Sequence, residues 1–318
     1  MKILEVDNLS TYFYASEGVV KAVDGVSFSL NKGEALGLAG ESGSGKTTTA
    51  FSIMRLIKPP GKIVSGQVLY KGDNLLDKGP SEMDRIRWSK ISIIFQGAMN
   101  ALNPVYTVGD QIVEAIVHHE GRSREEAWAR TEELLGLVGI DSSRARNYAH
   151  EFSGGMKQRV MIAMALALNP DLVIADEPTT ALDVIMERQI LDLIMDLRNR
   201  LNLSTILITH DLSIIAELCD RVGIFYAGKI VESATVRSLI DDPVHPYSKG
   251  LLGAFPTVDG PRKKLESIVG SPPSLINPPT GCRFHPRCSY AKEMCKKEEP
   301  PQQEIEPDRY VACHQIIR

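Results

Sequence analysis

The chain has 318 residues, 43% of them hydrophobic, and its 36 basic and 40 acidic residues give a formal net charge of −4. This length allows a large buried core and about two domains. The charges are mixed along the chain without a long block of one sign, which argues against a nucleic-acid-binding surface. The first residues mix acidic with apolar side chains, unlike a signal peptide, and no apolar run approaches about 20 residues. We therefore expect a cytosolic protein that does not span a membrane.

The first 96 residues are expected to form strands around one glycine-rich loop. Apolar and polar residues alternate in residues 21–30, as in a half-buried strand. Residues 34–57 run from an apolar strand through the glycine-rich loop into a helix, and residues 65–76 form a further strand pair or turn. The continuous apolar run at residues 90–96 is typical of a buried parallel strand.

Residues of about 97–152 are predicted to be a mostly helical insert. Ser123 and Glu126 have the spacing of a capping box, and the apolar residues that follow them recur at helical intervals. A further helix is predicted from Ser153 onward, stopped by the Asn-Pro pair at residues 169–170.

Two more apolar strands, residues 171–178 and 204–211, flank a helical segment at residues 183–201. Strands that alternate with helices indicate an α/β fold with a mainly parallel sheet. From about residue 236 the composition changes, because this part holds most of the prolines and four of the five cysteines. We interpret it as a separate extension with little regular structure.

The glycine-rich loop matches the pattern G-x-x-x-x-G-K-[ST] at Gly40, Gly45, Lys46 and Thr47. Its glycines let backbone N–H groups turn toward phosphate oxygens, and the helix that follows adds its dipole. Lys46 can reach the β- and γ-phosphates of a nucleotide, and Thr47 offers its hydroxyl to Mg²⁺. The alternative, a flexible glycine turn, does not explain why the loop follows a strand and opens a helix.

Asp176 and Glu177 end a predicted buried strand, where ligands bind in a doubly wound sheet. Asp176 can hold Mg²⁺, and Glu177 can polarise an attacking water as a general base. The competing interpretation is a pair of helix-capping carboxylates before Pro178.

Ser153, Gly154 and Gly155 stand at the start of a predicted helix and form a second candidate anion site. Two phosphate-binding helix ends in one chain suggest a nucleotide shared between subunits. An ordinary loop is the alternative for this segment.

His210 and Gln96 follow two other predicted strands. His210 could donate a hydrogen bond to a γ-phosphate, and Gln96 could ligate Mg²⁺ or orient water. The alternatives are a structural histidine and a glutamine that faces solvent.

Taken together, these motifs resemble those of ABC-type ATPases, in the family's order and spacing over residues 1–235. The matching elements are the Walker A motif at residues 40–47, the Q-loop at Gln96, the signature at 153–157, the Walker B motif at 172–177, the D-loop at 181–183 and the switch at His210.

The resemblance implies an α/β fold with a P-loop NTPase (RecA-like) core at residues 1–96 and 153–235, which includes an N-terminal antiparallel β subdomain. It also implies a helical subdomain at residues 97–152 and an irregular, metal-binding C-terminal extension at residues 236–318.

An ATP-driven dimer follows from the resemblance, in which the signature of one subunit closes on the nucleotide of the other. The side chains and backbone groups implied to contact ATP are Phe13, Gly40, Ser42, Gly43, Ser44, Gly45, Lys46, Thr47, Thr48, Ser153, Gly154, Gly155 and Asp183. The implied catalytic groups are Glu177, His210 and Gln96, with Mg²⁺ on Thr47, Gln96 and Asp176.

The chain departs from the family pattern at a few positions. Phe152 precedes the signature, Met156 replaces its glutamine, and Gly-Ala follows Gln96 where Asp-Pro is frequent. None of these changes removes a phosphate or metal ligand. Tyr12 and Tyr14 flank Phe13, which alignment favours as the aromatic residue that stacks on adenine.

Nearly the whole chain resembles one branch, the ATPase subunits of dipeptide and oligopeptide importers. The resemblance implies a peripheral protein on the cytoplasmic face of the cell membrane. Its implied partners are two membrane permease subunits, a second homologous ATPase (a heterodimer, or a homodimer in isolation) and, indirectly, an extracytoplasmic peptide-binding protein, with no nucleic acid. A nickel or other small-solute importer is the alternative, and a soluble ABC ATPase is disfavoured.

Four cysteines lie close together near the C-terminus, at Cys282, Cys288, Cys295 and Cys313. Four thiolates can bind Zn²⁺ or an iron–sulfur cluster, and the spacings leave the metal open, with free thiols or disulfides as alternatives. The family resemblance implies a structural [4Fe–4S] cluster. His285 and His314 are expected beside the ligands or in solvent, and Cys219 in the core.

Overall fold

The computed structural model describes residues 1–97, 101–253 and 268–316. The chain forms two compact units, which are considered separately. One unit comprises Met1, Asn31–Glu34 and Asp77–Leu207, and the other comprises Lys2–Leu30, Ala35–Leu76 and Ile208–Arg318. We call them the helical unit and the loop unit. The domain boundaries expected from the sequence stay predictions.

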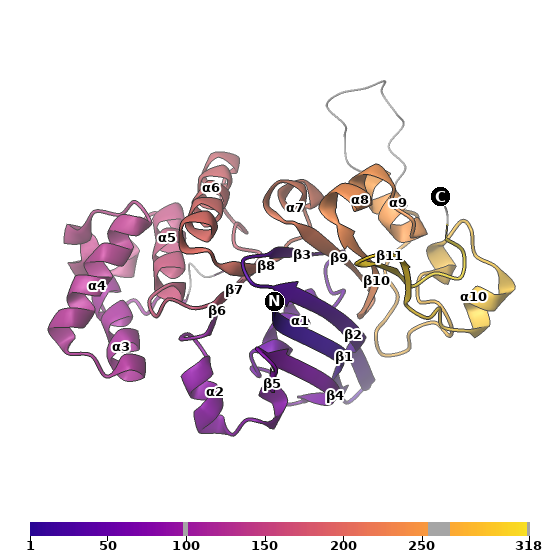
Figure 1. Ribbon diagram of the computed structural model, residues 1–318, viewed down its shortest axis with the longest axis horizontal. Helices are drawn as coiled ribbons and strands as arrows, with labels where there is room; N and C mark the ends of the chain where they lie inside the picture. The colour runs from indigo at the N-terminus through magenta and orange to yellow at the C-terminus, as the bar shows by residue number, and fades with distance from the viewer. Residues whose placement is uncertain (98–100, 254–267, 317–318) are drawn as a thin grey trace. The chain divides into compact units, whose positions relative to one another are not determined.

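An antiparallel sheet fills the N-terminal part of the loop unit (Figure 1). Its strands, in the order β2-β1-β4-β5, are β1 (Lys2–Ala15), β2 (Gly18–Asn31), β4 (Gly61–Tyr70) and β5 (Asp73–Asn74). Val6 of β1 faces Val68 of β4, and both side chains are buried. The expected strands of this segment are confirmed.

A second sheet in the loop unit has the order β11-β12-β10-β9-β3. Its strands are β3 (Ala35–Ala39), β9 (Arg221–Tyr226), β10 (Lys229–Thr235), β11 (Gln303–Glu306) and β12 (Arg309–Val311). Only the β3–β9 pairing among these is parallel. The expected parallel pairing holds for β3 with β9, whereas β9 and β10 are antiparallel because Ala227 and Gly228, both with positive φ, join them in a tight hairpin.

Short helices complete the loop unit. They are η1 (Leu75–Asp77), which ends at the unit boundary, α1 (Lys46–Ile53), α7 (Leu212–Leu218), α8 (Val236–Asp241), α9 (Pro246–Gly253), η5 (His285–Arg287) and α10 (Glu293–Lys297). A buried aromatic cluster of Tyr226, Tyr247 and Phe284 joins β9, α9 and the segment before η5. Residues from the C-terminal extension therefore belong to the core of this unit.

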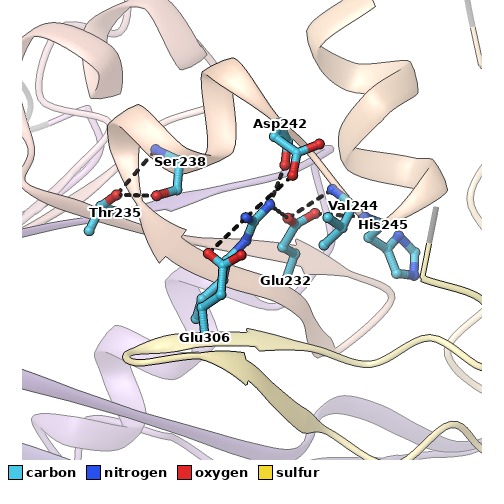
Figure 2. A network of polar contacts seen from close by, with 8 residues as sticks. Glu232, Thr235, Ser238, Asp242, Val244, His245 and Glu306 are labelled. Atoms are coloured by element: carbon cyan, nitrogen blue, oxygen red, sulfur yellow. Dashed lines mark hydrogen bonds and ion pairs between the residues drawn. The ribbon is translucent and has the colours of Figure 1, made fainter. Parts of the chain in front are cut away.

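The extension is less irregular than the sequence suggested. Strand β12 pairs with β10, which would otherwise expose an open sheet edge. Glu232, Asp242 and Glu306 gather beside these strands (Figure 2), and the buried Arg309 forms ion pairs with all three. This long-range charge network fastens the extension to β10.

The helical unit contains a smaller strand group in the order β8-β7-β6, with β6 and β7 parallel. These strands are β6 (Ile91–Ile94), β7 (Leu172–Asp176) and β8 (Ser204–Ile208), whose last residue is assigned to the loop unit. The helices are α2 (Pro80–Ile86), α3 (Val108–Glu120), α4 (Arg124–Leu137), η3 (Ser142–Arg146), η4 (Ala149–Glu151), α5 (Gly154–Ala165) and α6 (Val184–Leu201).

Local signals explain where these helices begin. Ser123 Oγ accepts from the backbone N–H of Glu126, and Glu126 accepts from that of Ser123, which confirms the capping box of α4. Asp183 caps α6 by accepting from the backbone N–H of Met186. In the described ranges, every helix falls short of the length and apolar character needed to cross a bilayer.

Candidate functional site

The glycine-rich loop joins β3 to α1, as the sequence predicted. Gly40 and Gly45 have φ of +147° and +110°. A Cβ atom would lie 2.2 Å from the carbonyl oxygen of Phe225 at Gly40, and 2.3 Å from that of Ala22 at Gly45. Glycine is therefore required at both positions by backbone conformation and by close packing.

Lys46 is folded into this loop and is 5% exposed. Its Nζ donates to the carbonyl oxygens of Gly40, at 2.7 Å, and Glu41, at 3.0 Å, and to Ser44 Oγ at 3.3 Å. These contacts keep a cation in the hollow of the loop, next to the first N–H groups of α1. Half-buried Thr47 and Thr48 follow it on α1. Charge and donors together suit a polyphosphate.

Asp176 and Glu177 follow directly from the buried strand β7. Asp176 is fully buried, and a buried carboxylate requires a cation or strong hydrogen-bond donors. The helix-cap alternative is wrong for both residues, because Asp183 caps the next helix, α6. Glu177 has a left-handed φ of +44°, which is uncommon for a residue with a side chain.

Gln96 and Glu177 meet in the helical unit. Gln96 Nε2 donates to Glu177 Oε2 at 2.7 Å, and Thr180 Oγ1 donates to the same oxygen at 2.9 Å. The meeting follows from topology, because β6 and β7 are parallel neighbours and their carboxyl ends share one edge. Gln96 is exposed, as the alternative interpretation expected, but its amide is bound to the candidate general base.

Ser153 and the two glycines after it open α5, as predicted. Exposed Ser153 is the N-cap, and its Oγ accepts from the backbone N–H of Met156 at 3.4 Å. Gly154 is half-buried and begins the helix. A Cβ atom on Gly155 would lie 1.8 Å from Met186 Cε of α6. Packing between α5 and α6 therefore requires glycine at position 155.

The remaining predicted site residues are exposed or half-buried. Asp183 is exposed in the helical unit, and His210 is exposed just after β8 in the loop unit.

Phe13 of β1 is half-buried and covers Gly61, opposite it on β4. Tyr12 donates its hydroxyl to Asp24 at 2.6 Å, while Tyr14 is exposed. Ser42 and Gly43 form the exposed crest of the glycine-rich loop.

The C-terminal cysteines Cys282, Cys288, Cys295 and Cys313 all line one small pocket in the loop unit, together with His245 and Phe284. All are free thiols, and burial raises the pKa of Cys282 to about 11. In the described part of the chain, however, no group of three or more Cys, His, Asp or Glu side chains is arranged so that it could hold a metal ion, so the structure does not support the expected metal-binding extension.

The two histidines beside the cysteines are held by backbone groups. His285 shares a hydrogen bond with the carbonyl oxygen of Cys282, and His314 with that of Glu298, both at 2.9 Å. Cys219 ends α7, half-buried against the aromatic core of the loop unit, close to its expected place.

Residues that sequence analysis overlooked also contact these motifs. Thr180 binds Glu177, and its only sequence signal is its place three residues after it. Arg287 and Tyr247 bind Glu41 of the glycine-rich loop. No spacing rule indicates contacts between residues more than 200 positions apart.

Comparison with known proteins agrees with this geometry. Residues 23–180 match the family model described as ABC transporter, and residues 231–295 match that of the oligopeptide/dipeptide transporter C-terminal region. The oligopeptide transport ATP-binding protein AppD of Bacillus subtilis is 46% identical over 98% of this chain and 96% of its own length. OppD of Salmonella typhimurium is 44% identical over 99% and 94%, and the dipeptide transport protein DppD of Bacillus subtilis is 46% identical over 95% and 91%.

Solved structures show the same fold. The ATP-binding cassette MJ0796, a dimer bound to ADP and phosphate, is 28% identical, with a TM-score of 0.66 over 74% of this chain and 99% of that one. CbiO1 of Clostridium perfringens, part of an ABC transporter complex, is 27% identical, with a TM-score of 0.66 over 76% and 91%. The chain belongs to the family of ABC-type ATP-binding proteins of oligopeptide and dipeptide transporters, and it is an ATP hydrolase.

Proposed function

We propose that this chain energises the import of dipeptides or oligopeptides, bound to a membrane transporter at the cytoplasmic face. The observation that carries the proposal is that the chain is similar, over nearly its full length, to proteins named for oligopeptide and dipeptide transport. The similarity includes the C-terminal region, which is matched by a peptide-transporter family model rather than by the general cassette model. We also propose that the chain is divided into an ATPase core (residues 1–96 and 153–235), a helical subdomain (97–152) and a C-terminal extension (236–318).

The loop of residues 40–48 binds the triphosphate of ATP in this proposal. Lys46 Nζ neutralises the β- and γ-phosphates, exchanging its bonds to loop carbonyls for bonds to phosphate oxygens. Backbone N–H groups from Ser42 to Thr48 donate to the same oxygens. Phe13 stacks on adenine.

Thr47, Gln96 and Asp176 would hold Mg²⁺ through oxygen atoms, the donors that this ion prefers. Bound there, the ion would neutralise charge on the transferring phosphoryl group. Glu177 accepts the proton of the attacking water as the bond between the γ-phosphorus and the bridging oxygen of ADP breaks. Gln96 and Thr180 hydrogen-bond to its carboxylate and so support its orientation. His210 donates to the γ-phosphate.

Ser153, Gly154, Gly155 and Asp183 act on the nucleotide of a second, homologous ATPase subunit, or of an identical one when the chain is alone. Exposure of Ser153 and Asp183 supports this role. Two membrane permeases bind the helical subdomain, and an extracytoplasmic peptide-binding protein delivers the cargo. ATP drives the cycle as a ligand with different affinities for the open and closed states.

The function is tested by uptake of labelled di- and oligopeptides into cells that depend on this transporter. Glu177→Gln should abolish uptake while the variant stays assembled with its permeases, because a neutral amide cannot accept the proton. Uptake at the wild-type rate in this variant would contradict the assignment of Glu177. Uptake of a non-peptide solute alone would contradict the cargo.

A [4Fe–4S] cluster on Cys282, Cys288, Cys295 and Cys313 forms the second part of the proposal. The support is chemical, since four thiols line one pocket and four thiolates are the usual ligands of such a cluster. Zn²⁺ is the alternative metal, since it too can be bound by four thiolates. The cluster would join short elements that have little core of their own.

Metal and sulfide analysis of anaerobically purified protein tests the cluster. We expect about four irons and four sulfides per chain, with visible absorption. One zinc without sulfide, or no metal at all, would contradict the cluster and leave the ATPase assignment intact.

A further inference from the structure

An arginine of the C-terminal extension, Arg287, forms an ion pair with the glycine-rich loop. Arg287 Nη1 lies 2.8 Å from Glu41 Oε2, and Nη2 lies 3.0 Å from Oε1. The arginine side chain is 6% exposed and that of Glu41 28%. Glu41 is the second residue of the loop, directly after Gly40. A two-pronged pair of this kind fixes orientation as well as distance.

The guanidinium of Arg287 is itself held in place. Its Nε donates to the carbonyl oxygen of Val269 at 3.0 Å, and Nη2 donates to that of Gly270 at 3.1 Å. Nη1 also donates to the Tyr226 hydroxyl at 3.4 Å. The carbonyls belong to the extension and the hydroxyl to β9. Lysine could not reproduce this planar set of donors.

A second residue of the extension holds the backbone of the same loop residue. The backbone N–H of Glu41 donates to the hydroxyl of Tyr247 in α9 at 3.1 Å. Tyr247 is fully buried, and its ring centroid lies 4.7 Å from that of Tyr226 and 5.4 Å from that of Phe284. Glu41 is thus fixed at its backbone and at its side chain.

The ion pair between Arg287 and Glu41 affects the charge of the loop that is proposed to bind phosphate. Glu41 places a carboxylate within a loop that has to accept a triphosphate, and like charges at short range repel strongly. Arg287 cancels that charge and turns the carboxylate toward the extension. Lys46, which donates to the carbonyl of Glu41, lies in the same loop.

We propose that the C-terminal extension is a working part of the ATP site, in which Arg287 and Tyr247 are positioning residues for the phosphate loop. Arg287 neutralises Glu41, and both residues hold the loop in its phosphate-binding shape. The inference rests on the proposed role of residues 40–48 in binding ATP. Because Arg287 precedes Cys288, and Phe284 lines the cysteine pocket, loss of order at the cysteines would weaken ATP binding through these residues.

The test is equilibrium binding of Mg-ATP to the full-length purified chain. Arg287→Ala should weaken binding at least tenfold, because it leaves the Glu41 carboxylate unneutralised in the loop. Adding Glu41→Gln to Arg287→Ala should recover most of the lost affinity, a rescue that a purely structural role of Arg287 would not produce. In the assembled transporter, KM for ATP should rise while kcat stays within about twofold.

Arg309→Ala is the matched control. The side chain of Arg309 is 5% exposed, lies in the same extension and pairs with Glu232, Asp242 and Glu306, none of which belongs to the loop. This variant should lower the melting temperature and leave the ATP affinity of the folded protein unchanged. Tyr247→Phe removes only a hydroxyl, and it should weaken ATP binding about threefold even if Arg287→Ala fails to fold.

Wild-type ATP affinity in both Arg287→Ala and Tyr247→Phe would overturn the inference. Equal losses in the Arg287 and Arg309 variants, without rescue by Glu41→Gln, would also overturn it, since the effect would then be general destabilisation. A wild-type chain that binds no ATP would instead contradict the proposed function.

Discussion

Two loops that follow buried strands place left-handed backbone on different kinds of residue. In the loop after β3, glycines at positions 40, 43 and 45 have positive φ. In the loop after β7, positive φ falls on Glu177, at +44°, and Ala181, at +68°. The glycine-rich loop therefore adopts its shape without side-chain strain, whereas the loop of the proposed general base, Glu177, adopts its shape at an energetic cost. Backbone donors need freedom from side chains, and a catalytic carboxylate needs a fixed direction.

The largest effect is expected when a glycine of the loop after β3 is given a side chain. Gly45→Ala brings a Cβ atom within 2.3 Å of the Ala22 carbonyl oxygen at a φ of +110°, so the loop must move. We expect ATP affinity to fall at least 100-fold in a binding titration. Gly136→Ala in α4, where a Cβ meets nothing within 4 Å, should leave affinity unchanged. Wild-type affinity in Gly45→Ala would show that the loop tolerates a side chain.

A smaller effect is expected in the loop after β7, where hydrogen bonds orient the carboxylate of Glu177, the proposed general base. Thr180→Val removes the donor that lies 2.9 Å from Glu177 Oε2. ATP turnover in the assembled transporter should fall about tenfold with ATP binding unchanged, because a hydrogen bond to a charged group is lost. Thr180→Ser keeps the hydroxyl and should keep most of the activity. Equal turnover in the valine and serine variants would exclude this role.

A carboxylate elsewhere in the loop unit makes a contribution to stability that depends on pH. Burial raises the pKa of Asp24, but the Tyr12 hydroxyl, Lys229 and Arg283 outweigh burial and hold it below its ordinary value of 3.8. A carboxylate whose pKa is lowered by folding stabilises the protein above that ordinary value, and the contribution disappears as the pH falls through and below it.

We therefore expect Asp24→Asn to lower the free energy of unfolding by about 1 kcal/mol at pH 7. The difference from wild type should shrink as the pH falls below about 4. Denaturant titrations of both proteins between pH 7 and pH 3 measure it. A constant difference across this range would show that the Asp24 charge contributes nothing.

The smallest effect is expected at Ala181, in the strained loop after β7. Ala181→Gly should relieve the left-handed conformation and raise the free energy of unfolding by up to about 1 kcal/mol. The same substitution at exposed Ala129, inside α4, should lower it by about 1 kcal/mol. Destabilisation by both substitutions would mean that the loop after β7 stores no strain at Ala181.

The two loops also differ in how much the sequence discloses. The phosphate loop was predictable because one continuous motif supplies its glycines, lysine and threonine. The strand-end residues were predictable because apolar strands preceded Asp176 and Gln96. The hydrogen bond between Gln96 and Glu177 was not, since it depends on β6 and β7 being neighbours.

The C-terminal extension shows the limit of pattern reasoning most clearly. Its prolines suggested an irregular tail, yet β12 pairs with β10, and Arg287 reaches a partner 246 residues earlier. Such contacts depend on tertiary packing, which local composition does not encode. The four cysteines were visible in the sequence, but only family resemblance favoured one metal over another.

The central claim is that ATP binds at residues 40–48, and equilibrium dialysis of the purified chain with labelled Mg-ATP tests it most directly. One ATP per chain should bind to the wild type and to Glu177→Gln, whereas Lys46→Ala should lose nearly all binding. This pattern needs neither permeases nor turnover. Binding that persists undiminished in Lys46→Ala, or no binding by the wild type, would contradict the assignment of the loop.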